Sequence, residues 1–149
     1  MIDYQRIFHT GHLVPNLNKA MQEIGASLGV TWATPWGYEP MIYWTPSGKK
    51  EASLKVTYSK QGPQHVELIE GTGFWAPQPG SGTHHVGVWT DNIAADASAL
   101  VKQGWKPVAS LLSPEEGWGR FCYLQPPSGG LRLELVSTEI KELMEGRWV

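Results

Sequence analysis

The chain has 149 residues, of which 41% are hydrophobic and 17% are charged, and its formal net charge is −2. This length and composition are typical of one folded domain and exclude a disordered or fibrous chain. No basic stripe is present to neutralise phosphates and no apolar run reaches about 18 residues, so we expect neither a nucleic-acid nor a membrane partner.

The first half predicts a strand, a helix and three further strands. Residues 6–14 read as a strand, and Asn16 is a suitable N-cap for a helix that ends at Gly29. The charged residues 49–51 are expected in a solvated turn. The three further strands are expected within 32–44, over 53–58 and over 66–69.

The second half repeats this order after a linker rich in glycine and proline at about 71–82. We expect a strand over 84–90, a helix over about 92–103, strands over 108–112, 119–125 and 132–137, and a terminal helix at about 138–148. The chain is thus predicted to be a single domain, 1–149, with module 1 at about 5–72 and module 2 at about 83–138. A strand–helix–three-strand unit cannot cover both faces of its sheet, which favours an α+β fold of two paired βαβββ modules in a half-open, mixed-sheet barrel.

The two halves also share a residue pattern. A shift of 76 positions places equivalent residues on one another: His9 and His85, Gly11 and Gly87, Asn16 and Asn92, Leu17 and Ile93. The glycine two residues after each histidine is on the same face of its strand, where it leaves room beside the imidazole or permits tight strand packing.

Each half closes on an apolar strand with a glutamate in its middle, at 66–68 and at 133–135. A buried carboxylate needs a partner, and a cation supplies one. The alternative is that all four residues are solvent-facing polar side chains, but their matching places in two repeats favour a shared site. We therefore predict a divalent-metal site whose ligands are His9, Glu67, His85 and Glu134.

Four segments resemble the vicinal oxygen chelate superfamily, which includes glyoxalase I, methylmalonyl-CoA epimerase, extradiol dioxygenases and bleomycin resistance proteins. These segments are 6–15, 66–69, 84–88 and 133–136, in the order of the family's motifs. The resemblance implies paired βαβββ modules and the same four metal ligands. Their His/Glu/His/Glu set is similar to that of glyoxalase I, whereas the epimerase usually carries Gln at the position of Glu67. Residues 21–24 lack the aromatic pair of the glyoxalase helix, which favours the epimerase-like branch.

The ligand set leaves room for oxygen atoms of a substrate and suits Ni, Co, Mn, Fe(II) or Zn as the cofactor. A metal-bound carbonyl would make the adjacent proton acidic, and Glu134 or Glu67 would accept that proton, with Glu134 preferred. The predicted function is a metal-dependent isomerase, epimerase or lyase with an enolate intermediate. Its substrate is expected to be a small molecule with a carbonyl or vicinal oxygens.

Other residues are expected near the site because of strand parity. Trp89 shares a face with His85, and Phe121 and Tyr123 share a face with each other, so all three are candidate substrate-binding residues. Among the remaining histidines, His65 has the best case for a position behind the ligands, since it shares the face of Glu67. Arg120 and Arg132 could meet a substrate carboxylate or phosphate, but surface salt bridges are the expected role.

Two other functions stay open at this point. Eight tryptophans favour a metal-free protein that sequesters a bulky aromatic ligand, and a biosynthetic cyclase or isomerase could use the same pocket without metal. The single cysteine, Cys122, excludes an intramolecular disulfide, and no signal-peptide-like segment is recognised, so we expect a cytoplasmic protein. A homodimer is expected.

Overall fold

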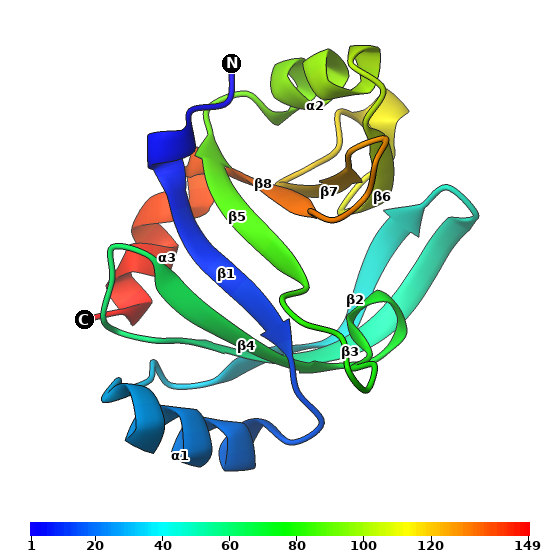
Figure 1. Ribbon diagram of the computed structural model, residues 1–149. Coiled ribbons are helices and arrows are strands. Elements are labelled where there is room, and N and C mark those ends of the chain that lie inside the picture. Colours follow the sequence, from blue (N-terminus) through cyan, green and yellow to red (C-terminus); the bar gives the residue numbers. More distant parts are fainter.

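A computed structural model of residues 1–149 shows eight strands closed into a barrel in the order β1-β4-β3-β2-β6-β7-β8-β5 (Figure 1). The strands are β1 Ile7–Leu13, β2 Trp36–Thr45, β3 Gly48–Tyr58, β4 His65–Gly71, β5 His85–Thr90, β6 Lys106–Ser110, β7 Phe121–Gln125 and β8 Leu133–Ser137. The helices are α1 Leu17–Leu28, α2 Ile93–Lys102 and α3 Lys141–Arg147. The predicted α+β fold with a C-terminal helix is confirmed.

The barrel has two equivalent halves that are joined very unequally. In each half the first strand pairs in parallel with the last, β1 with β4 and β5 with β8. The central strands β1 and β5 lie side by side and antiparallel (Figure 1), in a ladder that runs from Ile7↔Val88 to Gly11↔His85. On the far side, β2 meets β6 at one residue pair, Trp44↔Ser110. The predicted half-open barrel is therefore closed at this edge by a single pair.

Both faces of β4 and β8 are buried, because helices cover the barrel from outside. Leu133 and Leu135 belong to an outer cluster with the α2 residues Ala97 and Leu100, and α1 buries Leu17 against β4 in the same way. Side chains alternate along a strand, so Glu134 points to the opposite face, toward the interior. This alternation explains how one glutamate stands inside an otherwise apolar strand.

The caps that the sequence predicts fix both long helices. Asn16 Oδ1 accepts a hydrogen bond from the Lys19 backbone N–H, and Asn92 Oδ1 accepts one from the Ala95 N–H. Gly29 ends α1 in the left-handed conformation, with φ of 68°.

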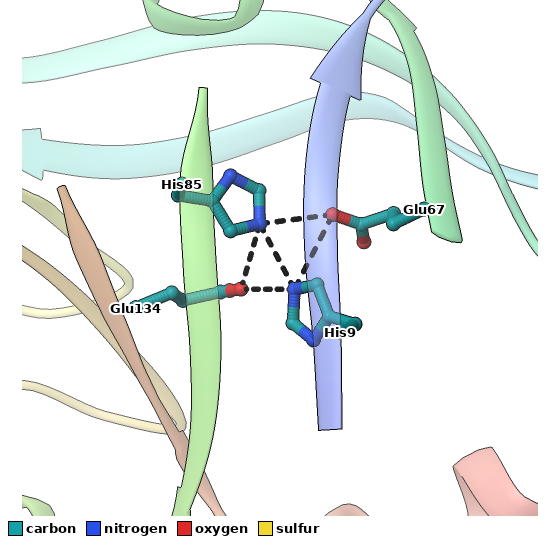
Figure 2. A group of neighbouring side chains, drawn as sticks. All are labelled: His9, Glu67, His85 and Glu134. Carbon is teal, nitrogen blue, oxygen red and sulfur yellow. Dashed lines mark hydrogen bonds and ion pairs between the residues drawn. The ribbon is translucent and has the colours of Figure 1, made fainter. Parts of the chain in front are cut away.

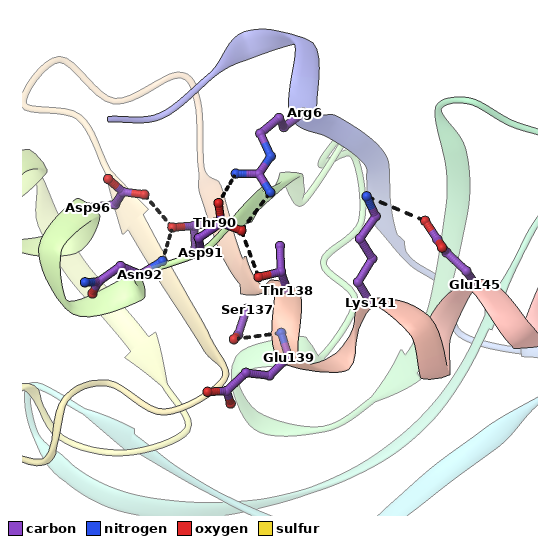
Figure 3. Close-up of polar contacts among 10 residues, drawn as sticks. All are labelled: Arg6, Thr90, Asp91, Asn92, Asp96, Ser137, Thr138, Glu139, Lys141 and Glu145. Atoms are coloured by element: carbon purple, nitrogen blue, oxygen red, sulfur yellow. Dashed lines mark hydrogen bonds and ion pairs between the residues drawn. The ribbon is translucent and has the colours of Figure 1, made fainter.

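An exposed polar network joins the start of β1, the end of β5 and the segment before α3 (Figure 3). The Asp91 carboxylate accepts hydrogen bonds from Arg6 at 3.0 and 3.2 Å and from Thr138 Oγ1 at 2.9 Å. Such surface pairs contribute little free energy. Their main effect is to fix where the C-terminal segment leaves the barrel.

Two local predictions are corrected. Residues 49–51 are not a turn but part of β3, where they pair with β2 from Ile42 to Trp44. The hairpin turn at Thr45–Gly48 sets this pairing and overrides their polar character. The terminal helix begins as a 3-10 turn at Thr138–Ile140 before α3. No helix in the structure combines the length and the apolar character needed to cross a bilayer.

Candidate metal centre

The structure brings His9, Glu67, His85 and Glu134 together inside the barrel (Figure 2). Each imidazole presents Nε2, and the two Nε2 atoms lie 2.9 Å apart. Glu134 Oε2 lies 3.0 Å from His9 Nε2 and 3.1 Å from His85 Nε2. Glu67 Oε1 lies 3.5 and 3.0 Å from the same two atoms. All four residues are buried, with exposed fractions of 8% or less.

The two central strands position each histidine over a glycine of the other half. His9 on β1 faces Gly87 on β5, and His85 faces Gly11. A Cβ atom at Gly87 would overlap the His9 ring, and one at Gly11 would overlap the His85 ring. Both positions therefore require glycine, because the histidine ring of the other strand lies directly against them. The sequence leaves two roles open for these glycines, room beside the ligand and tight strand packing, and in the structure each glycine has both roles.

A tyrosine lies opposite each glutamate on the neighbouring antiparallel strand. Tyr58 on β3 pairs with Glu67, and Tyr123 on β7 pairs with Glu134. Burial, and then the charges of the two carboxylates, raise the pKa of both phenols well above the usual value, so both keep their protons. Strand parity predicts Tyr123 near the site but does not predict Tyr58. The signal was the register of the two hairpins, which places a tyrosine beside each glutamate.

The four donors fit a divalent metal ion. Glu67 Oε1 and Glu134 Oε2 are buried and form no hydrogen bond of regular geometry, and both lie close to the two imidazole Nε2 atoms. A cation among these atoms would satisfy the two carboxylates. In a six-coordinate shell with bonds of about 2.1 Å, neighbouring donors are about 3.0 Å apart and opposite donors about 4.2 Å. The His–His distance and three of the four His–Glu distances match the first value, the exception being His9–Glu67 at 3.5 Å, and all four donors lie within 4.8 Å of one another. Four donors leave two positions of such a shell.

Charge within the cluster shifts the protonation of its members. Burial opposes charge on His85, but the carboxylates of Glu134 and Glu67 outweigh it and raise the pKa of His85 to about 9. Burial likewise opposes charge on Glu134, but the neighbouring His85 and His9 outweigh it and hold the pKa of Glu134 below its usual range. The metal-free centre at neutral pH therefore holds an ionised Glu134 beside a protonated His85.

His84 is the imidazole directly behind a ligand. Its Nδ1 lies 2.9 Å from His85 Nδ1, and a hydrogen bond at that atom fixes the ring of a metal-binding histidine. Burial, followed by the nearby positive groups, lowers the pKa of His84 to about 3, so its ring is neutral. His65, which the sequence favours for this role, instead bonds the Ser59 carbonyl at 2.6 Å and stacks on Trp148.

A cavity of about 340 Å³ opens onto the two carboxylates. Fifteen of its 19 lining residues are hydrophobic, and Phe121 and Tyr123 are among them. Trp89 is not: its ring stacks on Phe8 with centroids 3.8 Å apart. Trp89 shares the face of His85 but is four residues farther along β5, about 13 Å away. Strand parity predicts the face on which a side chain lies but not its distance from the site along the strand.

The pattern of glyoxalase, bleomycin resistance and dioxygenase proteins matches residues 8–123, which include three of the four donors and most of the barrel. The chain belongs to the glyoxalase/bleomycin resistance protein/dioxygenase superfamily. The family resemblance predicted from the sequence is thereby confirmed. Among curated proteins, none matches the chain.

Several solved structures have a similar fold at low sequence identity. A hypothetical protein from Bacillus halodurans is 18% identical, with a TM-score of 0.58 over 89% of this chain and 93% of that one. A variant of Streptomyces coelicolor methylmalonyl-CoA epimerase in complex with 2-nitronate-propionyl-CoA is 20% identical, with a TM-score of 0.55 and the same coverage. The methylmalonyl-CoA epimerase of Mycobacterium tuberculosis is 15% identical, with a TM-score of 0.58 over 92% of each chain.

Titration of the metal-free protein with Mn²⁺ at pH 7 is expected to release about one proton per ion bound. The pKa of His85 near 9 means that its imidazole is protonated at pH 7, and only a neutral imidazole can bind a cation. Below the raised pKa the proton competes, so apparent affinity should rise with pH and proton release should shrink as the pH passes 9. Calorimetry in two buffers of different ionisation enthalpy measures the release, and its absence at pH 7 would contradict the assignment.

Proposed function

We propose that this protein is a metal-dependent isomerase, epimerase or lyase that removes a proton from a carbon next to a carbonyl group. The observation that carries this proposal is the pair of buried carboxylates, Glu67 and Glu134, which line a mainly hydrophobic cavity beside two imidazoles. Ni, Co, Mn, Fe(II) or Zn would suit this donor set. When bound, such an ion would act as a Lewis acid on a substrate carbonyl.

The protein's own residues would handle the proton. Glu134 is ionised at neutral pH, as an acceptor of the substrate proton must be. Its lowered pKa does not make it a stronger base, so the driving force would come from a metal-bound carbonyl that acidifies the neighbouring C–H. Glu67 comes from the other half of the barrel and is the second carboxylate available at the same cavity. With one carboxylate removing a proton and the other returning it, an epimerisation becomes possible. The hydrophobic walls would exclude water and prevent loss of the proton to solvent.

The substrate would be a small molecule with a carbonyl or vicinal oxygens, and related structures support one class of candidates. Two of the similar proteins are methylmalonyl-CoA epimerases, and one is bound to 2-nitronate-propionyl-CoA. A branched acyl thioester is therefore the first compound to test. The expected homodimer stays a prediction.

Deuterium exchange tests the proposal without a known product. The Mn²⁺-loaded protein is incubated in D₂O with methylmalonyl-CoA and, separately, with a panel of small 2-hydroxyketones, and mass spectrometry follows deuterium at the carbon beside the carbonyl. Exchange that is lost on chelation and restored by Mn²⁺ supports the proposal. Purified protein that retains no divalent ion and catalyses no exchange would refute it.

One observation favours a second function, the sequestration of a bulky aromatic ligand. Six of the 19 residues that line the cavity are aromatic: Trp36, Tyr38, Tyr58, Trp75, Phe121 and Tyr123. Such a wall binds flat, apolar molecules without chemistry. Tight binding of an aromatic ligand by the chelated protein, unchanged by Mn²⁺, would favour this function over the enzyme.

A further inference from the structure

A second cavity, of about 460 Å³, lies behind the metal centre at the linker between the two halves. Its wall combines polar and small residues of the linker with the β7–β8 loop: Gln78, Ser81, Gly82, Thr83, Gly129 and Gly130. Two charged or titratable side chains line it, Arg132 and His84, and none of its lining residues is acidic. The cavity therefore has cationic and donor groups without an anion of its own.

Arg132 is half-buried there without a carboxylate partner. Its guanidinium carbon lies 4.9 Å from the centroid of the Phe74 ring. With the Gln125 amide oriented to face it, the Gln125 oxygen accepts from Nη2 at 2.7 Å and Nε at 3.2 Å. A guanidinium has five N–H donors, so three remain. The expected surface salt bridge of Arg132 is absent, and burial lowers its pKa.

His84 is the second polar side chain in contact with the Phe74 ring. Its centroid lies 4.9 Å from that of Phe74, so Arg132 and His84 both pack against one aromatic side chain. His85 turns Nε2 toward the metal centre, so its Nδ1 carries the hydrogen and donates to His84 Nδ1. With His84 Nδ1 accepting from His85, the ring hydrogen of His84 is on Nε2, which is buried and forms no hydrogen bond.

We propose that this cavity binds an oxyanion, the carboxylate or phosphate group of a small molecule, between Arg132 and His84. The guanidinium supplies charge and a planar donor fork, which suit both groups. The His84 Nε2–H supplies the further hydrogen bond. The occupant would be separated from the metal centre by one hydrogen-bonded imidazole, so this site is distinct from the cavity that opens onto Glu67 and Glu134.

Isothermal titration at low ionic strength tests the site, with inorganic phosphate and acetate as probes. Each anion is titrated into Mn²⁺-loaded and into chelated protein. We expect one saturable site, and the anion that binds more tightly shows whether a phosphate or a carboxylate is preferred. Arg132→Gln should weaken binding about tenfold or more, and His84→Phe about fivefold.

Two further variants keep the test decisive. Arg132→Lys retains the positive charge but loses the planar pair of N–H donors, so it should weaken binding severalfold. This variant provides the test if Arg132→Gln is poorly folded. Lys102→Gln removes one positive charge from the exposed end of α2 and should leave binding unchanged. Absence of saturable binding would overturn the proposal. Equal anion affinity of Arg132→Gln and the wild-type protein would also overturn the proposal, because the anion would then be bound to the metal ion or to another part of the surface.

Discussion

Replacement of Gly87 by alanine is expected to lower the affinity for Mn²⁺ by about 100-fold, although position 87 offers no ligand atom. A methyl group there would occupy the space of the His9 ring, and the ring must move away from Glu134 and His85. Overpacking of this kind should also lower the free energy of unfolding by about 1–3 kcal/mol. Calorimetry and thermal unfolding measure the two effects.

Three variants test the cause of that loss. Gly11→Ala should act in the same way through His85, because the two positions are equivalent. Gly82→Ala is the matched control, since a Cβ atom there would meet no atom within 4 Å. In the double variant Gly87→Ala/His9→Ala the clash is gone, so stability should recover while Mn²⁺ binding does not. Normal binding by Gly87→Ala alone would contradict the close approach.

Replacement of Glu134 by glutamine is expected to lower deuterium exchange into substrate by about 10²- to 10⁴-fold, because the amide cannot accept the proton. The amide oxygen can still face a cation, so part of the metal should remain bound. Exchange and bound Mn²⁺ must therefore be measured on the same sample. Loss of exchange with metal retained would assign Glu134 as the base.

Two comparisons separate the base from a ligand. Glu67→Gln should reduce exchange less, or on one face of the substrate only, if Glu134 is the main acceptor. Glu51→Gln, on the exposed part of β3, should have no effect. Full activity in Glu134→Gln would refute its role, whereas equal loss of metal and activity in both site variants would indicate ligands alone.

The sequence predicted the fold and the four clustered donors because both follow from local rules. Alternation along single strands separated Glu134 from Leu133 and Leu135, and repetition of one pattern paired His9 with His85. The two caps and the terminal glycine of α1 are equally local.

What the sequence missed depends on relations between strands. Tyr58 reaches Glu67 through hairpin register, and residues 49–51 become a strand through pairing with β2. His84 directly precedes β5, where strand alternation does not predict the contact of its ring with His85. Trp89 is on the same face of β5 as His85 but lies too far along the strand to reach the cavity, and it stacks on Phe8 instead. None of these can be read from one strand alone.

The unequal joints of the barrel have a consequence for ligand access. The ligands His9 and His85 lie on the long β1–β5 ladder, whereas the opposite joint consists of Trp44↔Ser110 alone. Separating two strands that pair at one position costs far less than separating a full ladder, so we expect local opening to begin between β2 and β6. The hydrophobic cavity has walls from both sides of that joint, including Met41 and Phe121. Lateral parting there would admit molecules larger than the resting volume while the chelating groups stay in register.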